Sequence, residues 1–333
     1  MRKIVLLSPL LLSCVSYAAS NPVDPLSAWK ETPVKQAIEK WVQESTRDGS
    51  PNYIPLDKRY VVFDNDGTLW PEAPLTFQLQ FAMDEIKRLA PVNLEWKNDP
   101  LVMAVLNDDF KTVAASGDKG LLKLVALTHS GMTTEEFSHR VSHWLDSHKN
   151  RHTGCRYDQL GYQPMRQLLD YLRANGFKTW IVSGGGSDFM RVMSQKMYGI
   201  PPEQVIGSFA LTEFRLTKDG PQLRKTMKGA FNDDKAMKPV AIHLFMGQRP
   251  VAAFGNSDGD LAMLQYTSAN PDYKTFEMLI HHTDAIREYA YDSHPPASGK
   301  LVDGLALAAK QGWSIVDMKQ DWNRVYDPEL CRK

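Results

Sequence analysis

Short runs of apolar, β-branched and aromatic residues alternate along most of the chain with longer segments in which apolar residues recur every three or four positions. The first pattern is typical of buried strands, and the second is typical of helices that pack on a sheet. The expected strands cover residues 60–63, 179–182, 205–206, 251–254 and 276–280. Helices are expected over residues 163–172, 188–197, 236–246 and from 261 onward. This alternation predicts an α/β fold with an open, mostly parallel sheet and helices on both faces.

Two segments depart from the alternation. Residues 75–147 carry several helical patterns, including 77–89 and 134–145, with no strand pattern between them. We therefore expect a helical cap domain over 71–155, inserted after the first strand, and a core domain built from 21–70 and 156–333. Residues 208–223 hold spaced apolar residues around a Lys-Asp-Gly turn, which favours a hairpin.

The first twenty residues have the features of a signal peptide. Arg2 and Lys3 precede an apolar run over residues 4–12, and small residues follow over 16–20. Cleavage after Ala18 or after Ser20 would release a protein exported to the periplasm or secreted. A lipobox-like sequence around Cys14 leaves a lipoprotein as the alternative. No later stretch is long and apolar enough to cross a membrane, so we expect no transmembrane segment in the mature chain.

The composition adds little about partners. The chain has 333 residues, of which 43% are hydrophobic, so a substantial core can form. Acidic and basic side chains are equal in number, 39 of each, which argues against a nucleic-acid partner. Beyond the signal segment two cysteines remain, Cys155 and Cys331. The sequence leaves open whether they form a disulfide or stay as two buried thiols.

Polar motifs follow the expected strands at the edge where ligands bind in open α/β sheets. The sequence D-N-D-G-T occupies 64–68 after the first strand, and S-G-G-G occupies 183–186 after the second. Lys235 begins a helix, and G-N-S-D-G-D at 255–260 follows the strand over 251–254. Asp64 and Asp66 are two residues apart, so an extended backbone can direct both carboxylates towards one site. Two such charges about 4 Å apart repel by about 4 kcal/mol at an effective dielectric of roughly 20, so they need a cation.

The order and type of these motifs resemble the haloacid dehalogenase superfamily, and the helical insertion is similar to its phosphoserine phosphatase-like branch. The match covers roughly residues 60–282 and implies a Rossmann-like fold. The resemblance implies a Mg²⁺-dependent phosphomonoesterase for a small phosphorylated metabolite. Asp64 would be the nucleophile that forms an aspartyl-phosphate, and Asp66 would be the general acid and base. A phosphotransferase of the same fold and a catalytically weak binding protein are the alternatives.

The other motifs extend this hypothesis. Ser183 and the backbone at Gly184 would bind the phosphoryl oxygens. Lys235 would neutralise charge on Asp64 and on the phosphate, in preference to Lys225 and Lys228.

The expected metal ligands are Asp64, Asp66, Asn256 and Asp260, with Asp258 as a further candidate. Asn256 departs from the family pattern because an aspartate usually stands there, so one charge is lost. His281 and His282 follow the last expected strand, but neighbouring residues on a strand point to opposite faces, which speaks against one shared metal ion.

Overall fold

The computed structural model describes residues 24–295 and 298–331. The segment that predicts a signal peptide, residues 1–20, lies outside the described residues. Within the described ranges, none of the helices combines the length and the apolar character needed to span a bilayer.

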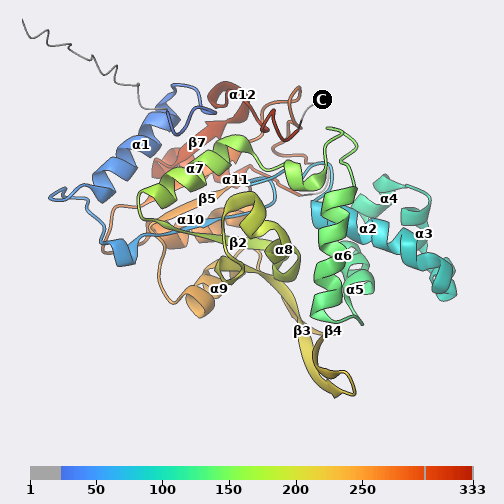
Figure 1. Ribbon diagram of the computed structural model, residues 1–333. Helices are drawn as coiled ribbons and strands as arrows, with labels where there is room; N and C mark the ends of the chain where they lie inside the picture. Colours follow the sequence, from blue (N-terminus) through green and yellow to red (C-terminus); the bar gives the residue numbers. More distant parts are fainter. Residues whose placement is uncertain (1–23, 296–297, 332–333) are drawn as a thin grey trace, which may run out of the picture.

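A seven-stranded sheet forms the centre of the molecule in the order β4-β3-β2-β1-β5-β6-β7 (Figure 1). All neighbouring strands are parallel except β3 and β4, which form an antiparallel hairpin at one edge. The predicted α/β class with a mostly parallel sheet is confirmed. The hairpin is longer than expected, and the edge strand β7 was not predicted. The strands are β1 (Tyr60–Phe63), β2 (Lys178–Gly186), β3 (Val205–Thr217), β4 (Gly220–Phe231), β5 (Ala252–Gly255), β6 (Phe276–His281) and β7 (Ser314–Asp317).

Helices cover both faces of the sheet, and the alternation of side chains along β1 shows how. Val61 and Phe63 belong to one buried cluster, and Val62 belongs to another on the opposite face. The first cluster includes residues of α1 (Pro33–Thr46), α7 (Gln163–Ala174) and α8 (Ser187–Tyr198). The second includes residues of α9 (Met237–Ala241), the π-helical turn Ile242–Met246, α10 (Leu261–Ser268) and α11 (Asp303–Gln311). The last helix is α12 (Met318–Asp321).

Between β1 and α7 the described chain forms five α-helices and no strand. These helices are α2 (Phe77–Leu89), α3 (Pro100–Leu106), α4 (Phe110–Ala115), α5 (Gly117–His129) and α6 (Thr134–Ser147). Helices α2 to α5 enclose a separate hydrophobic cluster that includes Ile86, Val102 and Leu124. The division of the chain into a core and a cap domain stays a prediction, but the insertion does have apolar packing of its own.

The hairpin of β3 and β4 extends from the sheet to the helical insertion (Figure 1). The backbone of Lys225 in β4 bonds to Gly131 and Met132, in the turn between α5 and α6, at N–O distances of 3.0 and 2.9 Å. The insertion is therefore joined to the sheet edge by backbone hydrogen bonds as well as by the chain itself.

A disulfide joins Cys155, the last residue of the insertion, to Cys331 near the C-terminus, with Cα atoms 5.5 Å apart. Of the two alternatives that the sequence leaves open, the structure has the disulfide. It closes a loop across 176 residues of sequence. Crosslinks of this kind typically stabilise a folded domain by roughly 2–4 kcal/mol.

Candidate active site

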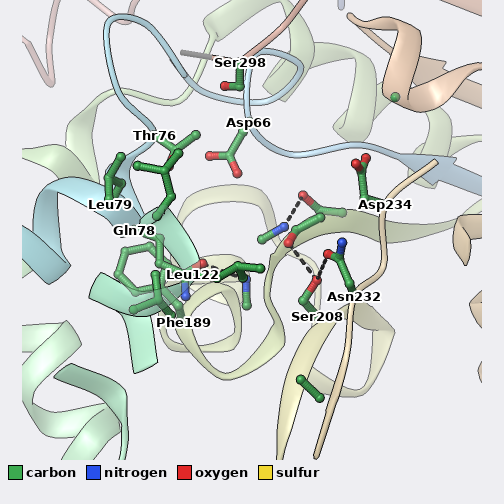
Figure 2. A pocket seen from close by; sticks show the side chains of 18 of the residues that line it. Asp66, Thr76, Gln78, Leu79, Leu122, Phe189, Ser208, Asn232, Asp234 and Ser298 are labelled. Carbon is green, nitrogen blue, oxygen red and sulfur yellow. Dashed lines mark hydrogen bonds between the residues drawn. The ribbon is translucent and has the colours of Figure 1, made fainter. Parts of the chain in front are cut away.

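A cavity of about 940 Å³ lies between the sheet, the helical insertion and the hairpin. Its floor is built from residues at the carboxyl ends of β1, β2 and β5, as expected for an open α/β sheet. Asp64, Asp66 and Ser183 line this floor together with Lys238. Figure 2 shows Asp66 beside the insertion residues Thr76, Gln78 and Leu79 around the same hollow.

Asp64 follows β1 directly and is buried, with 6% of its surface exposed. Its amide N–H donates to the carbonyl oxygen of Phe254 in the neighbouring strand, at 2.9 Å, so the backbone is held in the sheet register. Its Oδ1 accepts a hydrogen bond from Lys238 Nζ at 2.7 Å. Burial raises the pKa of Asp64, while the ammonium of Lys238 lowers it.

Asp66 lies two residues further along, where Gly67 turns the chain. Its Oδ1 accepts a hydrogen bond from Trp70 Nε1 at 2.6 Å. Burial raises the pKa of Asp66 to about 6, although the bond from Trp70 opposes the rise. A carboxyl group that titrates near neutral pH is suited to giving and taking a proton. Gly67 has a φ of +77°, and a Cβ there would lie 2.1 Å from Asn256 Nδ2, so the turn requires glycine.

The prediction for Lys235 needs correcting, because Lys238 occupies the place expected for it. Lys238 is 2% exposed and donates to Asp64 Oδ1 at 2.7 Å, to the carbonyl oxygen of Val182 at 3.0 Å and to Asp260 Oδ1 at 2.6 Å. Burial alone would lower the pKa of Lys238, but Asp260 and Asp64 raise it overall, so its charge is kept. Lys235 is 72% exposed at the cavity wall, and its nearest ion-pair partner is Asp234 at 3.9 Å.

The reason for this difference is local. Lys235 has a φ of +54°, in the left-handed region, so the helix begins only at Met237 instead of at residue 235. Lys238 then shares the buried face of the helical turns with Ala241 and Ile242, three and four residues further on. That apolar spacing is the signal that could have identified it.

Ser183 ends up on the cavity floor, 1% exposed, and its Oγ accepts a hydrogen bond from Gly185 N at 3.3 Å. Gly184 and Gly185 also line the cavity. A Cβ on Gly185 would lie 3.2 Å from Asp66 Oδ2, so this end of β2 passes close to the carboxylate. The N–H of Gly186 donates to Gln78 Oε1 at 2.7 Å, which joins the end of β2 to the helical insertion.

The loop after β5 brings Asn256, Asp258 and Asp260 to the same end of the sheet, but with different contacts. Asp260 accepts from Lys238 on one oxygen, and its other oxygen accepts from the N–H groups of Asn256 and Ser257 at 2.9 and 3.0 Å. It positions Lys238 and the loop, and both its oxygens are occupied. Asp258 lines the cavity and accepts from the N–H groups at the start of α11.

Glu72 lies against Asn256, and no sequence motif indicated it. Asn256 Oδ1 accepts from Thr68 Oγ1 at 3.0 Å, and its Nδ2 donates to Glu72 Oε1 at 2.5 Å. Glu72 is buried and also accepts from the hydroxyl groups of Tyr291 and Ser298, each at 2.8 Å. Burial raises the pKa of Glu72 to about 7, against the influence of His282. Glu72 therefore places a carboxyl group next to Asn256, the position at which the family pattern has an aspartate.

The two histidines have separate surroundings. His282 is buried, with its Nε2 2.8 Å from the carbonyl oxygen of Gly67 and its Nδ1 3.3 Å from Glu288. His281 lies 3.8 Å from Asp292 instead. His282 thus supports the turn that carries Asp66, and the two rings do not converge on one point.

The oxygen donors of the floor fit a magnesium ion. Asp64 and Asp66 each have one oxygen that makes no hydrogen bond within the described part of the chain, and both residues line the cavity. Asn256 adds an amide oxygen at the same end of the sheet, where it accepts from Thr68 Oγ1 at 3.0 Å. Mg²⁺ is usually held by one or two carboxylates together with water and substrate phosphate. Among the described residues no three His, Cys, Asp or Glu side chains gather as a complete protein cage.

Comparisons with known proteins show the family of the chain and structures of similar fold. The family model for haloacid dehalogenase-like hydrolases matches residues 61–265. No curated protein matches the sequence. A conserved, functionally unknown protein from Anaerococcus prevotii DSM 20548 is similar in structure, with 16% identity, a TM-score of 0.56, and coverage of 85% of this chain and 91% of that one.

Two further solved structures show weaker similarity. A protein of unknown function from Bordetella pertussis Tohama I has 15% identity and a TM-score of 0.49, covering 78% of this chain and 99% of its own. A phosphoserine phosphohydrolase-like protein from Francisella tularensis subsp. tularensis SCHU S4 has 16% identity and a TM-score of 0.38. The match covers 76% of this chain and 98% of that one. At these identities the structural similarity describes the fold, and the family follows from the sequence model.

Proposed function

Because the chain belongs to the haloacid dehalogenase-like hydrolase family, we propose that it is a Mg²⁺-dependent phosphatase that hydrolyses phosphomonoesters through Asp64. The observation that carries the proposal is the pairing of Asp64 with the buried ammonium of Lys238, with Asp66 on the same cavity floor. A nucleophilic carboxylate needs a neighbouring cation to approach a phosphate dianion, and Lys238 provides one.

The reaction then has two steps. An oxygen of Asp64 attacks phosphorus, the bond from phosphorus to the leaving alcohol oxygen breaks, and Asp66 gives that oxygen a proton. Water next attacks the phosphorus of the aspartyl-phosphate, Asp66 takes the proton from the water, and inorganic phosphate leaves with Asp64 restored. Ser183 and the backbone at Gly184 bind the phosphoryl oxygens during both steps.

Asp64, Asp66 and Asn256 would hold the magnesium ion. When bound, Mg²⁺ supplies positive charge that offsets the repulsion between the phosphate and the two carboxylates. Lys238 stays in place without it, because Asp260 and the carbonyl oxygen of Val182 hold its ammonium.

We also propose that the helical insertion, residues 71–155, acts as a cap that excludes water over a core formed by 21–70 and 156–333. The protein would be exported after loss of residues 1–20 and would act in the periplasm or outside the cell. The disulfide between Cys155 and Cys331 supports this proposal, because disulfides persist mainly in oxidising compartments.

The test is release of inorganic phosphate from para-nitrophenyl phosphate by the purified mature protein, with Mg²⁺ or with EDTA. We expect Mg²⁺-dependent turnover, and loss of turnover in Asp64→Asn, whose amide oxygen can still accept from Lys238 and so preserves the fold. Asp57→Asn is the matched control, since Asp57 is 75% exposed and lies outside the cavity. Turnover in Asp64→Asn equal to that of the unchanged protein would rule out the mechanism, and product analysis with added alcohols detects phosphotransfer.

A further inference from the structure

The cavity is much larger than its catalytic floor. Its roof is formed by α2, α5 and α8 and by the β3–β4 hairpin. The apolar side chains of this roof include Leu79, Leu121, Leu122, Val125, Phe189 and Met227. Figure 2 shows Leu79, Leu122 and Phe189 grouped around Gln78 on the side of the hollow that the insertion forms. The volume of about 940 Å³ is at the upper end for sites that hold drug-sized ligands, roughly 300–1,000 Å³.

Two of the apolar side chains that line the cavity are largely exposed to solvent. Leu122 on α5 is 57% exposed, and Met227 on β4 is 68% exposed. Leu79 and Phe189 also line the cavity but are buried, at 4% and 1% exposed. Exposed apolar side chains that line a concave site mark surface that a bound molecule can cover.

The polar groups of the roof are neutral or already paired. His129 is buried and lies 3.2 Å from Gln78 Nε2, and burial lowers the pKa of His129 to about 3, so its ring is uncharged. Lys225 is 8% exposed and forms an ion pair with Asp188. Within the roof, formed by α2, α5, α8 and the hairpin, Lys225 and Asp188 are paired with each other, whereas the cations Lys235 and Lys300 line the cavity outside the roof. A small zwitterion or a second phosphate would lose its hydration here without gaining a counter-charge.

We propose that the roof binds an uncharged, mainly apolar leaving group, so that the substrates are phosphate monoesters of bulky alkyl or aryl alcohols. This inference rests on the proposed phosphatase activity. Leu122 and Met227 are the residues that determine specificity, because they offer the apolar surface that the leaving group covers.

The experiment measures kcat/KM for ethyl, butyl, hexyl and octyl phosphate, with O-phosphoserine as a small zwitterionic substrate. The four alkyl alcohols are nearly equal as leaving groups, so differences report binding of the chain. We expect kcat/KM to rise by up to about fourfold for each added CH₂ until the roof is filled. O-phosphoserine should rank below butyl phosphate. A flat series, or O-phosphoserine as the best substrate, overturns the inference while leaving the phosphatase activity intact.

Variants assign the effect to the roof. Leu122→Asn and Met227→Gln should each lower the ratio of kcat/KM for hexyl phosphate to that for ethyl phosphate by several-fold. Leu94→Asn is the matched control, since Leu94 is 62% exposed in the same insertion and does not line the cavity. An unchanged ratio in both roof variants contradicts the assignment. Failure of the unchanged protein to hydrolyse any ester, including para-nitrophenyl phosphate, overturns the proposed function itself, and the inference falls with it.

Discussion

The floor and the roof of the cavity are built by different kinds of interaction. On the floor, Lys238 bonds to two carboxylates and a carbonyl oxygen, and Asp260 in turn bonds to two backbone N–H groups. On the roof, the main lining is apolar side chains from helix α5 and the hairpin, two of them open to solvent. A buried network of charges allows one geometry, because each group that moves would leave a partner unpaired. Apolar contacts are non-directional and accept ligands of different shape.

On this proposal the floor carries out the reaction, and the roof determines which esters are preferred. Changes on the floor should reduce turnover of every phosphate ester by a similar factor. Changes on the roof should alter the ranking of esters and leave the chemistry in place. A floor variant that alters the ranking of esters would contradict this division of roles between floor and roof.

After Asp64→Asn, the largest effect should come from Asp66→Asn. The amide keeps the shape and can accept from Trp70 Nε1, but it cannot transfer a proton. Proton transfer by a positioned side chain typically contributes about 10²–10⁴-fold. We expect kcat for butyl phosphate to fall by that range.

The dependence on the leaving group sharpens this test. Para-nitrophenolate leaves without a proton, so the first step with para-nitrophenyl phosphate should suffer much less, and a burst of para-nitrophenol should precede slow release of phosphate. An equal loss for both esters, without a burst, would mean that Asp66 acts in some other way than as the acid. The order of preference among alkyl esters should not change, because Asp66 is on the floor.

Lys238→Met should have the next largest effect. It removes the ammonium beside the nucleophile, and losing one preorganised donor typically costs about 10²–10³-fold in kcat. It also leaves Asp64 and Asp260 buried without their counter-charge, so the melting temperature should fall. The companion variant Lys235→Met should retain its melting temperature and most of its turnover, since Lys235 is 72% exposed. If Lys235→Met lost turnover and Lys238→Met retained it, Lys235 would be the catalytic lysine.

The sequence predicted the floor better than the roof, and the reason is geometric. Asp64 and Asp260 follow β1 and β5, and Ser183 lies near the carboxyl end of β2. These strands are parallel and their carboxyl ends meet at one edge, so the order of the residues along the chain is enough to bring them together. Lys238 was missed because it comes from a helix of only five residues, where one residue with positive φ moves the start of the helix.

Glu72 and the roof were outside the reach of sequence patterns. Glu72 meets Asn256 across 184 residues and Tyr291 across 219, and no local periodicity reports contacts of that separation. Leu122 and Val125 have the spacing of an ordinary amphipathic helix, which predicts a buried face. Whether that face meets protein or an open cavity depends on where the hairpin lies.

The smallest effect is expected at Asn256, because Glu72 already places a carboxyl group beside it. Asn256→Asp should lower the Mg²⁺ concentration that gives half-maximal activity by no more than about tenfold, because the added charge attracts the cation. It should also lower the melting temperature in EDTA. The reason is that Asn256 Nδ2 donates to Glu72 Oε1 at 2.5 Å, so an aspartate would set a second carboxylate against a buried one.

The double variant Glu72→Gln with Asn256→Asp separates the attraction between the added charge and Mg²⁺ from the repulsion between the added charge and Glu72. It keeps the total charge of the floor, and the glutamine amide can donate where the asparagine amide did. Its melting temperature in EDTA should recover towards that of the unchanged protein, whereas Glu72→Gln alone should weaken Mg²⁺ binding measured by calorimetry. If Asn256→Asp were as stable as the unchanged protein without metal, Glu72 would be uncharged there. Glu72 would then not replace the charge that Asn256 lacks, and the floor would hold its metal with one carboxylate fewer.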